Sequence, residues 1–155
     1  MKAILCLLAF QEPKSFLDNS IVRISNDWLK QVNSKNYHHF FPRAYLQKRI
    51  PFDYRINHIA NITIVDDHLN KRKIRDRAPA DYMRDFQARN KHLAQTMQTH
   101  LIDLDTFGIW NNDFDTFFKK RCERISNELA SRVIRHSVDD LQQPIELNDV
   151  EEVAV

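Results

Sequence analysis

The chain has 155 residues, enough for one domain with a sizeable core, and its 43% hydrophobic and 28% charged residues are typical of globular proteins. A single glycine, Gly108, argues against a glycine-rich phosphate loop, and two distant cysteines exclude a cysteine-rich zinc site or a disulfide framework. All 23 Lys and Arg residues precede position 136, whereas six of the 21 acids lie within 139–155. Residues 1–138 therefore carry a net charge of +8, which is compatible with a polyanionic partner.

The N-terminal segment predicts one helix and an irregular stretch. Residues 2–10 are apolar and predict a short core helix that ends before Pro13. Residues 11–20 are polar and predict a loop. A brief strand over 21–24 and a helix over 28–32, capped by Asn26 or Asp27, are both compatible with the mixed residues that follow.

Residues 36–74 predict two strands that alternate with two short helices. Residues 36–41 are aromatic and apolar around two histidines and predict a strand. Pro42 suits the first turn of a helix over 43–49, which Pro51 ends. The β-branched run within 59–65 predicts a second strand, Asp66-Asp67 a turn, and residues 68–74 a short basic helix.

The second half of the chain predicts two longer helices and a tail. Pro79 at the first helical position predicts a helix whose apolar side reaches towards Leu101. Asn112 or Asp113 can cap the longest helix, which ends at about His136. Its core-facing stripe at helical spacing consists of Phe114, Phe117, Phe118, Cys122 (or Arg121), Ile125, Leu129 and Val133. We expect the acidic tail, residues 139–155, to be mobile.

Two features bear on the compartment. Cys6 and Cys122 have apolar neighbours in the sequence, so we expect buried free thiols in a reducing, cytoplasmic environment. The N-terminal apolar run is short, and the sequence predicts neither a signal peptide nor contact with a membrane.

The pair His38-His39 carries the chemistry that we predict. Hydrolysis of a phosphodiester needs a base, a cation and rigid placement of both. Neutral imidazole, with a pKa of about 6.5, suits the base, and His nitrogens and Asn oxygens can hold a divalent metal. Adjacent residues of a regular strand point to opposite faces, so the two histidines can share a site only if the strand ends or bends there, as Pro42 allows.

Three short motifs around this pair resemble a known family. His38-His39-Phe40-Phe41-Pro42, Asn61 and Asn70 look like the three parts of the HNH (His-Me finger, ββα-metal) nuclease motif. Over longer stretches, the sequence is similar to the C-terminal nuclease domain of GmrSD-type restriction proteins; these stretches are residues 57–61, 70–74 and 78–82. The resemblance covers nearly the whole chain before the acidic tail. It implies an α+β, mostly helical nuclease domain over 1–138, with a small ββα-metal core over about 36–75 embedded between flanking helices.

The resemblance also implies a role for each motif residue. His39 is the general base, and Asn61 holds the geometry that aims it. His38 and Asn70 are the ligands of a single divalent metal, with Mg²⁺ or Mn²⁺ expected. His38 stands where many relatives have Asp, which gives a softer site in which Zn²⁺ or Ni²⁺ also compete. We expect Asn57 to cap a loop and take no part in catalysis.

A basic strip follows Asn70 directly. It places five cations within seven positions: Lys71, Arg72, Lys73, Arg75 and Arg77. Beside a phosphodiester site these side chains predict contacts with a nucleic-acid backbone, the alternative being a solvated basic turn. Arg43 and Lys48 could extend the strip.

The sequence therefore predicts a metal-dependent DNA endonuclease or nickase that acts on double-stranded DNA. The resemblance implies a role in phage defence or modification-dependent restriction, where an upstream ParB-like nucleotide-binding region is a further candidate partner. Two alternatives stay open. One is a non-catalytic module that binds nucleic acid or a partner and needs an upstream domain, and the other is an RNA-directed nuclease.

Overall fold

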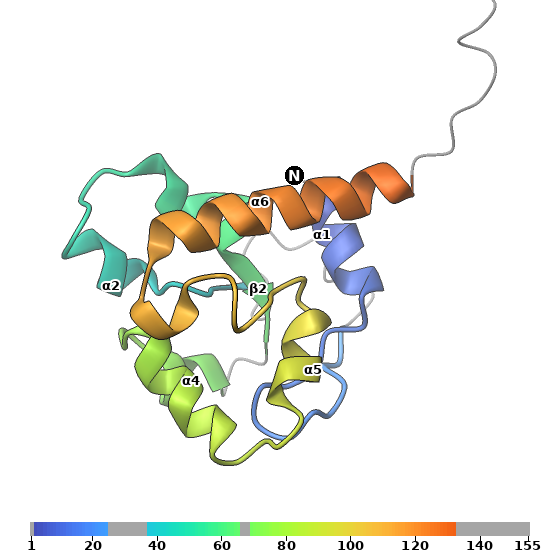
Figure 1. The fold of residues 1–155 in the computed structure, drawn as a ribbon, viewed down its shortest axis with the longest axis horizontal. Coiled ribbons are helices and arrows are strands. Elements are labelled where there is room, and N and C mark those ends of the chain that lie inside the picture. Colours follow the sequence, from blue (N-terminus) through green and yellow to red (C-terminus); the bar gives the residue numbers. More distant parts are fainter. Residues whose placement is uncertain (1, 25–36, 66–68, 133–155) are drawn as a thin grey trace, which may run out of the picture.

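The computed structural model describes residues 2–24, 37–65 and 69–132 (Figure 1). Over these ranges the fold is α+β and mostly helical, with one two-stranded antiparallel sheet, as the sequence predicts at this level. The predicted helix over 28–32, the predicted turn at Asp66-Asp67 and the acidic tail lie outside the described residues. The side chains of Asn70 and Lys71 also lie outside what the structure describes.

The sheet consists of strands β1 (Tyr37–His39) and β2 (Ile62–Ile64), with His38 opposite Thr63. Both strands are shorter than predicted. The chain bends at Phe40 and Phe41 after β1, and residues Ile59–Asn61 form the 3₁₀ turn η2 instead of the start of a strand. The cause is local, because the His58 side chain accepts a hydrogen bond from the Ala60 amide and caps this turn. Residues 21–24 also fall short of a strand and give one isolated bridge, between Lys14 and Ile21.

Besides η2, two short helical segments lie between β1 and β2 in the sequence, and a third follows β2. Helix α2 (Arg43–Gln47) follows Pro42, as predicted, but ends two residues early. The 3₁₀ turn η1 (Tyr54–Asn57) begins after Asp53, whose carboxylate accepts a hydrogen bond from the Arg55 amide. The predicted short basic helix is a single π-helical turn, η3 (Asn70–Ile74).

The helix predicted to run from Pro79 towards Leu101 is two helices, so this prediction was wrong. Helix α4 (Pro79–Gln87) and helix α5 (Leu93–Gln98) are separated at Asn90. This buried side chain donates to the Phe16 carbonyl at 3.1 Å and accepts from the His92 amide at 2.9 Å. These side-chain hydrogen bonds compete with the backbone hydrogen bonds that a continuous helix would form at this point. The Phe16 carbonyl, from the N-terminal segment, is the partner that makes them favourable.

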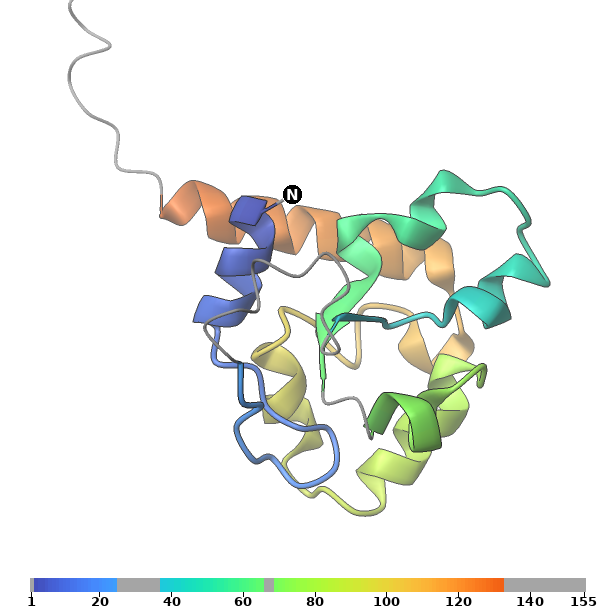
Figure 2. The same cartoon turned by 180° about the vertical axis from the view of Figure 1, so that it is seen from behind.

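The longest helix, α6 (Phe114–Ser131), is capped by Asp113, which accepts a hydrogen bond from the Thr116 amide at 3.0 Å. Figures 1 and 2 show α1 (Lys2–Phe10) and α2 at opposite ends of α6. The buried face of α6 contains Arg121, whereas Cys122 is half-buried. Cys6 is exposed, so the expectation of two buried thiols was wrong for this residue.

An aromatic core holds the segment that follows β1. The Phe40 ring stacks on Phe117 of α6 at 4.8 Å, and the Phe41 ring lies 4.9 Å from Phe117. The Tyr82 hydroxyl of α4 donates to the Phe40 carbonyl. Since both aromatic residues are fully buried, the chain directly after His39 has a fixed position.

Helix α6 also fixes β2 through a buried charge. The Arg121 side chain is 0% exposed, and its Nη2 donates to the Ile62 carbonyl at 3.0 Å. Burial lowers the pKa of Arg121 to about 9, so the guanidinium remains charged at neutral pH. Across residues 2–24, 37–65 and 69–132, no helix combines the length and apolar character needed to cross a membrane.

Candidate functional site

Both histidines of the predicted pair face one open pocket of about 200 Å³. Its lining residues are His38, His39, Pro42, Arg43, Ala44 and Arg75. Both histidines belong to the paired strand β1, in which His38 is buried and His39 half-buried, and the chain bends directly after them at Phe40 and Phe41, where Pro42 and α2 complete the pocket wall. We refer to this depression as the histidine pocket.

The His39 ring is held by a residue from η1. Its Nε2 lies 3.1 Å from the Asn57 Oδ1. Because the amide oxygen accepts, Nε2 carries the proton and Nδ1 keeps its lone pair. Burial lowers the pKa of His39 below the ordinary 6.5, the Asn57 hydrogen bond acts in the opposite direction, and the Arg43 charge lowers it further. His39 is therefore neutral at pH 7 and able to accept a proton.

Asn61 lies below the pocket and does not line it. Its side chain is 0% exposed and makes three hydrogen bonds. Oδ1 accepts from the Phe41 amide at 2.9 Å, and Nδ2 donates to the carbonyls of Phe41 and Ile56 at 3.0 and 2.9 Å. Asn61 thus ties the chain that follows His39 to the turn that carries Asn57.

Of the two predicted metal ligands, the structure describes the surroundings of the His38 side chain but not those of the Asn70 side chain. His38 is 8% exposed and lines the histidine pocket, and the Thr63 hydroxyl donates to its carbonyl. Asn70 begins η3, but its side chain is outside the described part. Among the described residues no group of three or more His, Cys, Asp or Glu side chains could hold a metal. Among the described residues, the pocket lining offers imidazole and no carboxylate, a donor set that suits Mn²⁺, Ni²⁺ or Zn²⁺ better than Mg²⁺.

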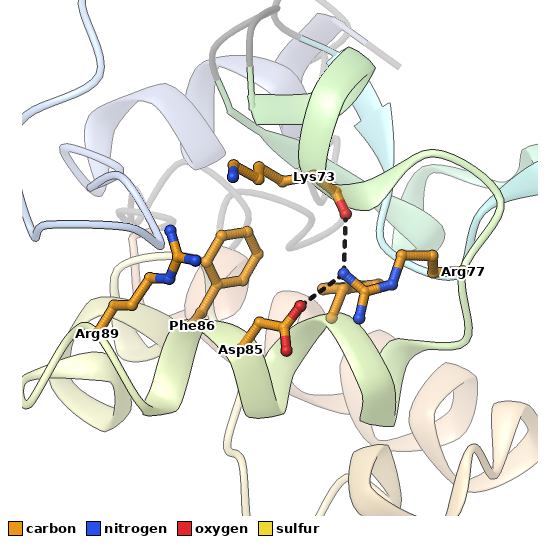
Figure 3. Close-up of a pocket in the computed structure, with 6 residues that line it drawn as sticks. Lys73, Arg77, Asp85, Phe86 and Arg89 are labelled. Atoms are coloured by element: carbon orange, nitrogen blue, oxygen red, sulfur yellow. Dashed lines mark hydrogen bonds and ion pairs between the residues drawn. The ribbon is translucent and has the colours of Figure 1, made fainter.

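The structure divides the predicted basic strip. Arg75, in a left-handed conformation at φ 52°, lines the histidine pocket, and Arg72 is exposed. Lys73 and Arg77 line a separate depression of about 30 Å³ together with Arg89 (Figure 3). The Arg77 Nη1 donates to an Asp85 carboxylate oxygen at 2.7 Å and to the Lys73 carbonyl at 3.3 Å. The positive charge of Arg77 is therefore partly compensated.

Among the described residues, the cations that line the histidine pocket are Arg43, from α2, and Arg75, directly after η3. Arg43 is exposed, as the suggested extension of the strip requires. Lys48 does not line the pocket but lies beside the strip, since its Nζ pairs at 3.3 Å with Asp76, the residue after Arg75. Two guanidinium groups therefore flank the pair of imidazoles, and planar forks of this kind bind phosphate oxygens.

Asn57 is a residue of the candidate site that our sequence analysis did not assign to it. Its position depends on η1, which is anchored by the Asp53 cap and by an Arg55 side chain that bonds both Asp53 and Asp115. The contact between Asn57 and His39 thus depends on how η1 packs against β1, which is a feature of the tertiary structure. The nearest sequence signal is the presence of Asn57 in the stretch that resembles the family, four residues before Asn61.

Comparisons of the chain with protein-family models, with curated proteins and with solved structures find no match. Any function must accordingly be supported by the chain's own residues, and the histidine pocket is the place where base, cations and open space coincide.

Proposed function

We propose that this protein is a metal-dependent endonuclease or nickase of double-stranded DNA, with an HNH-type ββα-metal core over about 36–75. The observation that carries the proposal is the pocket that His38 and His39 share with Arg43 and Arg75. A neutral imidazole can activate water there, and two guanidiniums can bind the phosphodiester that the water attacks. A role in phage defence or modification-dependent restriction is part of the same proposal.

His39 is the general base in this mechanism. Its Nδ1 takes the proton of the attacking water, and Asn57 holds the Nε2–H in place at 3.1 Å. Arg43 and Arg75 bind the non-bridging phosphate oxygens, which orients the phosphorus atom towards the water. Asn61 is a positioning residue, because its hydrogen bonds act on the backbone and do not reach the pocket.

The residues proposed to hold the metal are His38 and Asn70. The His38 imidazole fits this task, and the imidazole donors that the described residues bring to the pocket lining favour transition metals. A bound divalent cation would stabilise the charge that develops on the phosphate and on the leaving oxygen. We accordingly expect Mn²⁺ to support cleavage better than Mg²⁺, with Ni²⁺ or Zn²⁺ as further candidates.

Nicking of supercoiled plasmid in Mg²⁺, Mn²⁺, Ni²⁺ or Zn²⁺ tests the proposal. We expect metal-dependent nicking by the wild-type protein and a loss of about 100-fold or more in His39→Ala, the range for removal of a general base. His92→Ala is the matched control, because His92 is exposed on the loop before α5 and does not line the histidine pocket. Equal nicking by the wild-type and His39→Ala proteins would show that His39 is not the base.

A further inference from the structure

A pair of exposed aromatic side chains lies next to the proposed site. Phe52 is 101% exposed and Tyr54 is 78% exposed, although large aromatic side chains elsewhere in the described chain are mostly buried. Both line an open pocket of about 380 Å³, together with Gln47, Pro51, Asp53, Ile56 and Asn57. A pocket of this volume falls within the range of small-molecule sites, about 300 to 1,000 Å³.

This aromatic pocket adjoins the histidine pocket through Asn57. Asn57 is one of the residues that line the aromatic pocket, and its Oδ1 contacts the His39 Nε2 at 3.1 Å. A ligand in the aromatic pocket therefore lies one side chain away from the proposed base. We infer that the two pockets receive neighbouring parts of one molecule.

The turn that carries the aromatic pair is anchored by hydrogen bonds of Asp53, Arg55 and Ile56. Asp53 caps η1 and receives two Arg55 nitrogens, and a third Arg55 nitrogen bonds Asp115 of α6 at 2.6 Å. Ile56 is buried and its carbonyl accepts from Asn61. Phe52 adopts φ +69°, a strained conformation for a bulky residue. The exposed rings are thus held on a supported turn.

The charged residues near Phe52 and Tyr54 indicate which class of ligand the aromatic pocket can bind. Asp53 is the acid in the pocket lining and is paired with Arg55 at 2.6 Å. Arg43 and Arg75 in the neighbouring pocket favour a phosphate. A flat apolar surface next to a cationic one matches a nucleotide, whose base stacks on aromatic rings while its phosphate binds the cations. In a paired duplex the faces of the bases are covered, so a base that can stack here must be unpaired.

We propose that Phe52 and Tyr54 form a stacking platform for an unpaired nucleobase next to the phosphodiester in the histidine pocket. The choice of a nucleic acid as ligand rests on the proposed function. The platform would direct cleavage towards bulges, flipped bases or gaps in DNA. We expect stacking of one base on a protein aromatic ring to give a preference of about tenfold for a bulged over a fully paired duplex.

Binding without cleavage tests the platform. The probe is a duplex with a one-nucleotide bulge that carries 2-aminopurine, studied in EDTA, with the fully paired duplex as reference. We expect the wild-type protein to quench the 2-aminopurine and to bind the bulged duplex about tenfold more tightly. The double variant Phe52→Ser, Tyr54→Ser should lose both effects. Phe10→Ser is the matched control, because Phe10 is 69% exposed and lies on α1 at the other end of α6 (Figure 1).

Two results would overturn the platform. One is an unchanged preference and unchanged quenching in the double variant. The other is equal binding of bulged and paired duplexes, together with concentration-dependent self-association of the wild-type protein that is lost in the double variant. That result would show that the aromatic pair makes a protein contact. Quenching without any nicking activity would support the platform and contradict the nuclease proposal, whereas nicking without quenching would do the reverse.

Discussion

Replacement of Asn57 by Asp provides a direct probe of the His39 site. In the wild-type protein the amide oxygen of Asn57 lies 3.1 Å from the His39 Nε2 and carries no net charge. A carboxylate oxygen at the same distance would stabilise the imidazolium by about 1.3 kcal/mol at an effective dielectric constant of about 80, and by about 2.7 kcal/mol at about 40. At about 1.36 kcal/mol per pKa unit, the pKa of His39 should rise by about one to two units.

Histidine side-chain NMR measures this pKa without reference to activity. Burial holds the pKa of His39 below 6.5 in the wild-type protein, and Asn57→Asp should raise it, with the resonance assigned from the His39→Ala spectrum. Since only neutral His39 accepts a proton, nicking increases with pH up to this pKa, and the acidic limb of the pH profile should move upward by the same amount. Asn127→Asp, an exposed site on α6, adds the same charge as a control. An unchanged His39 pKa in Asn57→Asp would refute the contact.

Three further predictions concern stability. Asn61→Ala removes three buried hydrogen bonds and should lower the free energy of unfolding in urea by about 3 kcal/mol, at about 1 kcal/mol for each bond; a change below about 1 kcal/mol would contradict this role. Burial lowers the pKa of His100, whose Nε2 donates to the Lys14 carbonyl, to about 4. The unfolded chain therefore binds a proton below pH 6.5 while the folded chain does not, and stability should fall by about 3 kcal/mol between pH 6.5 and pH 4. Denaturation at several pH values should show a shallower decline in His100→Gln, and equal slopes would contradict the assignment. Gly108→Ala should lower stability by about 2 kcal/mol in thermal unfolding, because Gly108 has φ +71° and an added Cβ would lie 2.9 Å from the Asp113 Cβ; an unchanged melting temperature would contradict the clash.

Local signals were sufficient to predict several elements. The apolar run of α1, Pro42 before α2, Pro79 at the start of α4 and the Asp113 cap of α6 all act within a few residues of the structure that they determine. The single glycine also has a local reason, since it adopts a left-handed conformation before η4 (Ile109–Asn111). Such features require no knowledge of the tertiary structure.

Features that depend on distant partners could not be predicted in this way. The break between α4 and α5 depends on the bond from Asn90 to Phe16, 74 residues away. The stripe on α6 left Cys122 and Arg121 as alternatives, and the buried Arg121 donates through Nη2 to Ile62 of β2, while its Nε and Nη1 have no hydrogen-bond partner in the described part of the chain. In both cases a buried polar side chain donates to a backbone carbonyl that is distant in the sequence.

The candidate site shows the same limit. The sequence drew attention to His38 and His39, but the pocket that they border also needs Arg43 of α2 and the distant Arg75, and the chain between β1 and α2 is held by the aromatic contacts of Phe40 and Phe41 with α6. Asn57 reaches His39 only through the packing of η1. The basic strip looked uniform in the sequence, yet Arg75 lines the histidine pocket whereas Lys73 and Arg77 line another one, because η3 ends at Ile74 and the chain turns at Arg75, which adopts a left-handed conformation.

The most direct test of the account is chemical rescue at His39. Nicking of supercoiled plasmid in Mn²⁺ would be compared for the wild-type protein and His39→Gly, each with and without added imidazole. The account predicts that the wild-type protein nicks, that His39→Gly is at least about 100-fold slower, and that imidazole restores nicking to the variant only. Nicking by His39→Gly at the wild-type rate without imidazole would contradict the assignment of the general base and, with it, the proposed mechanism.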